Sequence, residues 1–226
     1  MQYKIVLASG SPRRREIMDL VGAEYIVIPS DKEEDMSGHE PSVLVEKLSK
    51  MKAEDVAAKI KGRVDIGSLS KDYLNSVVIG CDTVVAYEGK ILGKPHNEER
   101  AFEMIRDFAG KSHHVFTGVC LIVLENGNIE RTVNYSVSTA VNVLPMSDDE
   151  IRKYIATGET LDKAGAYAIQ GRFCPFIESI EGDYYNIVGY PISSIYHELN
   201  KLGIQLFYAI TSLTNFSIFA SLSLLS

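Results

Sequence analysis

Apolar residues recur along the chain with two spacings, and these predict alternating strands and helices. Runs of consecutive apolar residues, within Tyr3 to Ser9 and within Ser76 to Gly80, are typical of strands buried on both faces. Apolar residues three and four positions apart predict one helix from Pro12 to a stop at Gly22 and a longer one after Pro41. The first half of the chain should therefore alternate single strands with helices.

The rest of the chain predicts a hairpin among shorter elements. Asn126-Gly127 is a strong signal for the tight turn of a hairpin between two long strands. Turn and capping residues delimit the other elements. These are strands at 25–29 and 83–87, helices at 97–110, 147–158 and 191–203, and short strands around AYAIQG and FIESI. The segment 61–75, KGRVDIGSLSKDYLN, is expected to be a loop insertion.

Together these elements predict an α/β fold, in which helices flank a mixed, twisted sheet and a groove separates two lobes. The length of 226 residues suits one large domain, which we place at residues 1–206. Residues 207–226 form an uncharged, apolar extension. Hydroxyl and amide side chains interrupt this extension and would need partners inside a bilayer, so an ordered apolar or poorly packed terminus is favoured over a membrane anchor.

Composition limits the classes of partner. The net charge of −7 opposes the broad basic surface that nonspecific nucleic-acid binding requires, so an anionic ligand must be held by a few local cations. The 3 cysteines are widely spaced and show no CxxC or zinc-ligand pattern, which favours a reducing compartment. The N-terminus already predicts a strand rather than a secretory signal. A cytoplasmic location is expected.

The segment SGSPRRR follows the first predicted strand and could bind phosphate. A helix N-terminus has unpaired backbone N–H groups and partial positive charge, and three arginines would strengthen such a site. Because successive helical side chains point about 100° apart, one or two of Arg13, Arg14 and Arg15 can enter a cleft while another faces water. The alternative is a capped helix with a solvated basic turn.

Asp82 lies between two apolar strand-like runs, where a carboxylate is costly to bury without a cation or several donors. It could be a general base, a metal ligand or a turn-capping residue. Glu33 and Glu34 lie in an acidic segment that is ordinarily solvated surface. Combined with Asp82, however, they could hold Mg²⁺ or Mn²⁺ beside substrate phosphates.

Three further polar residues have both a functional and an ordinary interpretation. Lys52 lies near the edge of a predicted helix face and Lys94 in a Gly-Lys-Pro turn, so each could bind phosphate or be a surface lysine. Gln170 could contact a base edge or satisfy the end of a strand. The residues alone leave these alternatives open.

Seven segments in order make the span from about Ile5 to Leu202 resemble the Maf family of nucleoside triphosphate pyrophosphatases. They are LASGSPRRREIM, KMKAE, IGCDTVVAY, ILGKP, HHVFTGV, DKAGAYAIQG and GDYYNIVGYPI. The resemblance implies a Maf/Ham1-like fold with a nucleotide-binding cleft between its lobes. It also implies cleavage of a nucleoside triphosphate to the monophosphate and pyrophosphate, a divalent cation, Mg²⁺ or Mn²⁺, and a homodimer.

The resemblance also assigns roles to individual residues. Asp82 resembles the proton acceptor, and Glu34 with Asp82 resembles the pair of carboxylates on the metal side. The expected phosphate ligands are Ser9, Arg13, Lys52 and Lys94. Arg13, Thr83 and Gln170 resemble the branch that prefers dTTP and UTP, rather than the branch acting on 7-methyl-GTP. Use of a purine, or a nucleotide-sensing module that binds without turnover, remains the alternative.

Overall fold

The computed structural model describes residues 3–35, 40–65 and 67–207. Within them, seven strands form one mixed sheet in the order β2-β1-β3-β5-β6-β7, with β4 paired to the side of β3. The pairs β1–β2 and β1–β3 are parallel, and the remaining pairs are antiparallel. The strands are β1 (Lys4–Leu7), β2 (Tyr25–Val27), β3 (Ser76–Tyr87), β4 (Lys90–Leu92), β5 (Ser112–Glu125), β6 (Asn128–Val143) and β7 (Ile177–Glu181). The mixed, twisted sheet expected from the sequence is confirmed.

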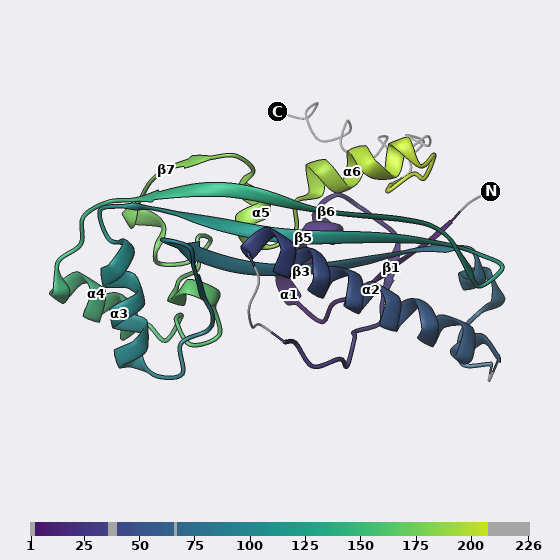
Figure 1. Ribbon diagram of the computed structural model, residues 1–226, viewed down its shortest axis with the longest axis horizontal. Coiled ribbons are helices and arrows are strands. Elements are labelled where there is room, and N and C mark those ends of the chain that lie inside the picture. Colours follow the sequence, from purple (N-terminus) through teal and green to yellow (C-terminus); the bar gives the residue numbers. More distant parts are fainter. Residues whose placement is uncertain (1–2, 36–39, 66, 208–226) are drawn as a thin grey trace, which may run out of the picture.

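Helices cover this sheet at both of its ends. They are α1 (Pro12–Leu20), α2 (Pro41–Asp65), α3 (Glu98–Phe108), α4 (Asp148–Ile155), α5 (Tyr184–Val188) and α6 (Ile192–Lys201), with short 3₁₀ turns η1 (Lys71–Leu74), η2 (Ala164–Ala166) and η3 (Cys174–Phe176). Strands β3, β5 and β6 run along the whole molecule (Figure 1). At one end they carry α3 and α4, and at the other α1, α2 and α6, so the two expected lobes share one sheet.

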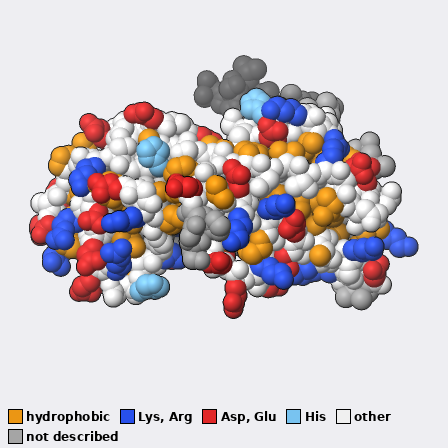
Figure 2. Space-filling model, in the orientation of Figure 1, with side chains coloured by type: hydrophobic (Ala, Val, Ile, Leu, Met, Phe, Trp, Pro, Cys, Tyr) orange, Lys and Arg blue, Asp and Glu red, His pale blue; other side chains and the backbone are white. Residues whose placement is uncertain are grey.

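The apolar core has separate parts on the two faces of the sheet. Alternate residues of β3 point to opposite faces, so Ile79 packs with α1 and α6 whereas Val78 packs beneath α2. A third cluster lies in the lobe of α3 and α4 around Phe108 and Phe173. Charged side chains of both signs are interspersed over the face of both lobes seen in Figure 2.

Helix α2 lies directly against the backbone of the sheet. A Cβ atom placed on Gly80 would come within 2.3 Å of the Ser49 carbonyl oxygen, and one on Gly118 within 2.0 Å of the Val45 carbonyl oxygen. Only glycine leaves room for this approach. The close packing brings the side chains of α2 over the middle of β3, where Asp82 lies.

Several local predictions differ from the structure. The segment 61–75 is not a simple loop, because its first five residues extend α2 and residues 71–74 form η1. The segment AYAIQG forms turns rather than a strand, since Gly165 and Ala166 both have positive φ angles, 69° and 62°. The 83–87 strand is continuous with the one before it, as a single β3, and α5 has no counterpart among the predicted elements.

The C-terminal extension can be compared with the structure only at its first residue. Leu206 is buried against the core, whereas Phe207 is half exposed and stacks on Tyr196. Residues 208–226, on which the expected extension depends, lie outside the described residues. Among the helices of the described ranges, none combines the length and apolar character needed to cross a membrane.

Candidate active site

A cavity of about 400 Å³ opens where β3 lacks a neighbouring strand along one edge. Strand β1 pairs with β3 as far as Ile79, and β4 pairs with β3 only from Val85 onwards. The cavity lies beside the gap between them. It is lined from one lobe by the start of α1, Glu34 and Lys52, and from the other by Lys94 and residues 162–170. The expected cleft between two lobes is therefore present.

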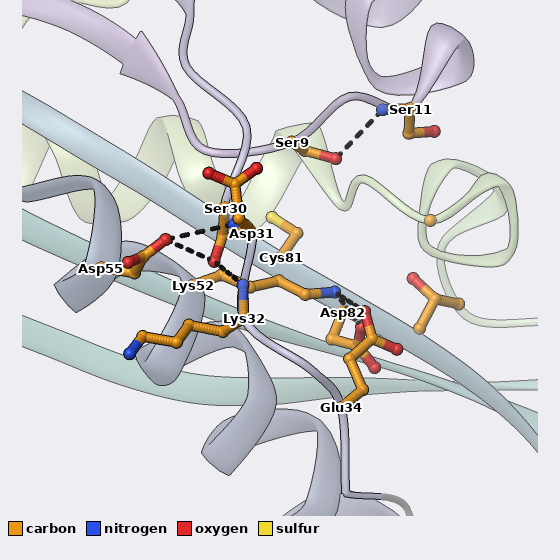
Figure 3. Close-up of polar contacts among 12 residues, drawn as sticks. Ser9, Ser11, Ser30, Asp31, Lys32, Glu34, Lys52, Asp55, Cys81 and Asp82 are labelled. Carbon is orange, nitrogen blue, oxygen red and sulfur yellow. Dashed lines mark hydrogen bonds and ion pairs between the residues drawn. The ribbon is translucent and has the colours of Figure 1, made fainter. Parts of the chain in front are cut away.

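Three side chains from distant segments meet at one point of this cavity (Figure 3). The ammonium nitrogen of Lys52, on α2, lies 2.5 Å from Asp82 Oδ1 and 2.7 Å from Glu34 Oε1. The Lys52 side chain is 13% exposed and that of Asp82 8%, whereas Glu34 is more open at 43%. The two carboxylates predicted to face a metal do converge, and both contact the same cation.

Burial sets the acidity of Asp82. Desolvation raises the pKa of its carboxyl, and Glu34 adds to this, while Lys52 and Arg14 lower the pKa; the net shift is upward from the ordinary value of 3.8. A carboxylate with a raised pKa binds a proton more tightly. Burial therefore favours the protonated form of the Asp82 carboxyl more than in an exposed aspartate.

The start of α1 presents an uncapped helix N-terminus to the cavity. Pro12 is the first helical residue as expected, and the Ser11 hydroxyl makes no capping hydrogen bond. Ser11, Pro12 and Arg13 all line the cavity. Free backbone N–H groups and the positive end of the helix dipole can therefore face an anion there.

The adjacent Arg14 is buried and also lines the cavity, where its hydrogen bonds join several segments. Its guanidinium donates hydrogen bonds to the carbonyl oxygens of Gly189, at 2.8 Å, and Cys81, at 2.9 Å. It also donates to Ser9 Oγ, at 2.8 Å, and Thr83 Oγ1, at 3.2 Å. Arg14 was expected only as one of three arginines that could enter a cleft, although Ile17 and Met18, three and four residues later on the buried face, indicate its inward direction.

Ser9 lies behind the cavity rather than among its lining residues. It is buried, and its hydroxyl oxygen accepts hydrogen bonds from Arg14 and from the backbone N–H of Ser11, the latter at 3.3 Å. Within the structure its contacts therefore fix the strand-to-helix turn. The prediction that Ser9 contacts phosphate directly stays a prediction.

Hydrogen-bond polarity restricts what the Thr83 hydroxyl can do. Thr117 Oγ1 donates to the Asn186 carbonyl oxygen at 3.0 Å, so the 2.9 Å bond between the two threonines uses the hydrogen of Thr83. Thr83 Oγ1 also accepts from Arg14. A hydroxyl oxygen has two lone pairs, and Thr83 is left with the capacity to accept one further hydrogen bond from a ligand.

The second lobe supplies cavity residues that the sequence predicted and others that it did not. Lys94 and Gln170 are exposed side chains that line the cavity, as expected. Asp162 and Lys163 also line it and form an ion pair with each other. The backbone N–H of Gly165 donates to the Gly93 carbonyl oxygen at 3.1 Å, which holds these two segments together. Asp162 and Lys163 lie in the segment DKAGAYAIQG, on which the family resemblance partly rests, but only Gln170 of that segment was predicted to be a site residue.

The residues around Asp82 fit a hard divalent cation. In the described ranges, no cluster of three or more His, Cys, Asp or Glu side chains could hold a metal. Glu34 and Asp82 nevertheless bring carboxylate oxygens to one positively charged atom. Mg²⁺ and Mn²⁺ prefer oxygen ligands, and Mg²⁺ commonly takes only one or two from carboxylates, with water and substrate phosphate completing its shell. Glu34 and Asp82 would supply such carboxylate ligands.

The fold and the cavity together define an α/β protein with a cleft lined by charged side chains from two lobes. The family model described as Maf-like protein matches residues 4–202, and the chain belongs to this family. A relative from Lachnoclostridium phytofermentans is 45% identical over 90% of this chain and 98% of its own length. Another, from Agathobacter rectalis, is 42% identical over 89% and 98%. Both relatives are named dTTP/UTP pyrophosphatase.

A solved structure is also similar to this chain. It is the Staphylococcus aureus Ham1 protein, matched over 88% of this chain and 99% of that one, with 14% identity and a TM-score of 0.43.

Proposed function

We propose that the protein hydrolyses dTTP and UTP to the nucleoside monophosphate and pyrophosphate. The observation that carries the proposal is the meeting of Glu34, Lys52 and Asp82 at one point of a cation-lined cavity. Relatives that align over nearly their whole length bear the name of this activity. The relatives' names support the reaction class, and residues that line the cavity would perform it.

Cationic groups around the cavity would bind the triphosphate. Arg13 and the open N-terminus of α1 face it from one lobe, and Lys94 and Lys163 from the other. Lys52 lies between them and can exchange a carboxylate contact for a phosphate oxygen. Because hydrolysis of a phosphoanhydride depends mainly on positioning and charge neutralisation, this arrangement addresses the principal demand of the reaction.

Asp82 and Glu34 would hold the divalent cation. When bound, Mg²⁺ or Mn²⁺ would polarise the phosphate oxygens and neutralise charge that develops on them. Asp82 would accept a proton from a water molecule as the water oxygen attacks the α-phosphorus. The bond from that phosphorus to the bridging oxygen then breaks, and pyrophosphate leaves with its charge compensated by the surrounding lysines.

Thr83 and Gln170 would select the base. Uracil and thymine carry an N3–H donor, which matches the one hydrogen bond that Thr83 can still accept. The exposed amide of Gln170 could donate to a base carbonyl from the other side of the cavity. A base that left these polar groups unpaired would bind more weakly, which provides selectivity.

The experiment combines a nucleotide panel with separate detection of the two phosphate products. With Mg²⁺ or Mn²⁺, dTTP and UTP should release pyrophosphate and no orthophosphate, and Asp82→Asn should lower kcat by roughly 10²- to 10⁴-fold. Release of orthophosphate would contradict the proposed bond. Tight nucleotide binding without turnover would instead support a sensing module, and preference for 7-methyl-GTP would place the chain in the other branch.

The assembly and location belong to the same proposal. We propose a cytoplasmic homodimer that acts on free nucleotides rather than on nucleic acid. Light scattering on the purified chain should give twice its 25.0 kDa mass. A monomer with full activity would show that the dimer is not needed.

A further inference from the structure

Residues 30–35, here called the acidic loop, lie along helix α2 and are attached to it by charge pairs in reverse order. Asp31 pairs with Lys59 at 2.7 Å, and Glu34 pairs with Lys52 at 2.7 Å. Next along the loop, Asp35 lies 3.9 Å from Lys47. The residue numbers rise along the loop while those of the paired lysines on α2 fall, so the loop runs antiparallel to the helix. Residues 31–35 are solvent-exposed, as the sequence suggested, but three of their carboxylates pair with lysines of α2.

Asp55 forms the strongest attachment at the start of the acidic loop. Its carboxylate accepts hydrogen bonds from the Ser30 hydroxyl at 2.8 Å and from the Asp31 backbone N–H at 3.3 Å (Figure 3). The same carboxylate lies 2.8 Å from the Lys59 ammonium, and the Asp55 side chain is only 13% exposed. Two loop groups and one lysine are thus fixed by a single side chain.

The contacts around Asp55 favour the charged form of its carboxyl group. Burial raises the pKa of the Asp55 carboxyl, but the hydrogen bonds from Lys59, Ser30 and the Asp31 backbone outweigh it, and the net pKa is below the ordinary value. Asp55 therefore stays a carboxylate at neutral pH. The ionised carboxylate remains an acceptor for the Ser30 hydroxyl and the Asp31 backbone N–H.

Helix geometry connects this attachment to the cavity. Lys52, Asp55 and Lys59 are three and four residues apart and so share one face of α2. Lys52 lies about 4.5 Å along the axis from Asp55, and an extended chain covers about 10 Å in three residues. Fixing Ser30 and Asp31 at Asp55 consequently keeps Glu34 within reach of Lys52, with which it pairs.

We propose that Asp55 is a positioning residue, which holds the acidic loop so that the Glu34 carboxylate is presented to the divalent cation together with Asp82. The inference rests on the proposed function, which makes Glu34 and Asp82 the metal-side pair. Asp55 itself contacts neither the cation nor the nucleotide. It acts on metal affinity through the placement of Glu34, as residues that orient metal ligands do.

The test measures Mn²⁺ binding to the nucleotide-free protein, by titration calorimetry or by the electron paramagnetic resonance signal of free Mn²⁺. Asp55→Ala should raise the Mn²⁺ dissociation constant roughly tenfold. Hydrogen exchange at the backbone amide of Asp31 should accelerate, because that amide loses its acceptor. Glu54→Ala is the matched control: it removes the neighbouring carboxylate of α2, which pairs only with Lys50 at 3.8 Å in the described contacts and should leave Mn²⁺ affinity unchanged.

Two further variants separate positioning from general loosening. Glu34→Gln should weaken Mn²⁺ binding by itself, and adding Asp55→Ala to Glu34→Gln should weaken it no further, because the two act through one ligand. Asp55→Asn keeps an acceptor for Ser30 and should give an intermediate dissociation constant. If Asp55→Ala accelerates exchange at Asp31 but leaves Mn²⁺ affinity as in the parent, the positioning role is wrong.

The variants also tell the two proposals apart. If Glu34→Gln binds Mn²⁺ as tightly as the parent, the metal assignment of the proposed function fails, and the inference fails with it for that reason. If Glu34→Gln weakens binding and Asp55→Ala does not, only the inference fails. A double variant weaker than Glu34→Gln alone would show that Asp55 acts by another route.

Discussion

Consecutive arginines at the start of α1 perform different tasks because each points in a different direction. Arg14 is 8% exposed and connects α1, β3 and the turn at Gly189 through its hydrogen bonds. Arg13 and Arg14 both line the cavity, whereas Arg15 is exposed to water. Because the Arg14 guanidinium is already bound to backbone and side-chain acceptors, Arg13 should mainly affect nucleotide binding and Arg14 mainly stability.

Replacing each arginine by methionine tests this division. Arg14→Met leaves buried acceptors at Cys81 and Gly189 without their donor, which should lower the free energy of unfolding by roughly 2 to 4 kcal/mol. Arg13→Met should change it by less than about 0.5 kcal/mol and raise the KM for UTP instead. Urea denaturation with steady-state kinetics measures both. Equal loss of stability in the two variants would contradict the division.

Thr83 allows a test of base recognition by a single hydroxyl. Thr83→Val removes the remaining acceptor and should lower kcat/KM for UTP by roughly ten- to a hundredfold. Thr83→Ser keeps the hydroxyl and its bonds to Arg14 and Thr117, and should retain most activity. Kinetics on UTP and CTP would show the effect. A Thr83→Val enzyme that keeps the parent preference for UTP over CTP would place recognition elsewhere.

The sequence predicted some site residues and missed others for physical reasons. Asp82 could be found because a carboxylate between apolar strand residues needs a cation, and Lys52 is that cation. Arg14 was not singled out because a run of arginines alone does not show which one turns inward; the buried Ile17 and Met18 on the same helix face carry that signal. The pairing of the acidic loop with α2 could not be predicted, since it depends on the register of two segments that are distant in sequence.

At the scale of elements, the position of Lys52 depends on how closely α2 approaches the sheet. Asp82 of β3 and Gly118 of β5 are register partners, and α2 crosses both strands there. The absence of a side chain at Gly118 leaves room for the Val45 carbonyl. A larger residue would force the helix outward and move Lys52 away from Asp82.

Gly118→Ala tests this dependence. Overpacking against helix backbone should lower the free energy of unfolding by roughly 1 to 3 kcal/mol, and kcat/KM should fall as Lys52 is displaced. Gly62→Ala, in the exposed part of α2 with open space around the new methyl group, should instead add about 0.5 to 1 kcal/mol. Thermal unfolding and kinetics of both variants give the comparison; unchanged activity in a folded Gly118→Ala protein would refute the role of the close approach.

Elements with a clear apolar period or turn signal were predicted well, and elements shaped by tertiary contacts were not. The hairpin at Asn126 and the capping box at Ser147 are confirmed. The segment around Ala166 failed, because the pattern AYAI suggests a strand whereas packing against Val85 and the pairing of Gly165 with Gly93 impose left-handed turns. Local alternation cannot reveal such an override.

At the scale of the whole molecule, the lobe of α3 and α4 contains a buried histidine that links its core to the cavity. His113 is 1% exposed, its ring centroid lies 4.6 Å from that of Phe108, and its Nε2 lies 2.8 Å from the hydroxyl of Tyr167, which lines the cavity. Burial, with a smaller contribution from His114, lowers the pKa of His113 from 6.5 to about 4. The folded protein therefore keeps this imidazole neutral.

A histidine whose pKa is lower in the folded than in the unfolded state makes the free energy of unfolding decrease as the pH is lowered. Above pH 6.5 His113 is neutral in both the folded and the unfolded state. Between pH 6.5 and about 4, the unfolded chain binds a proton at His113 and the folded protein does not. At 1.36 kcal/mol per pKa unit, acidification across this window should cost about 3 kcal/mol of unfolding free energy, levelling off below it. The loss would be reversible and would affect the whole cooperative unit.

His113→Gln should remove this part of the pH dependence. The variant will be less stable than the parent at pH 7.5 because it loses ring packing against Phe108, but the difference should shrink as the pH falls to 4.5. Urea midpoints at several pH values measure it, and His114→Gln, at the exposed neighbour, is the control that retains the parent slope. Parallel curves for His113→Gln and the parent would mean that other groups drive acid unfolding. Converging curves would show that one neutral ring makes the lobe beside the cavity sensitive to acid.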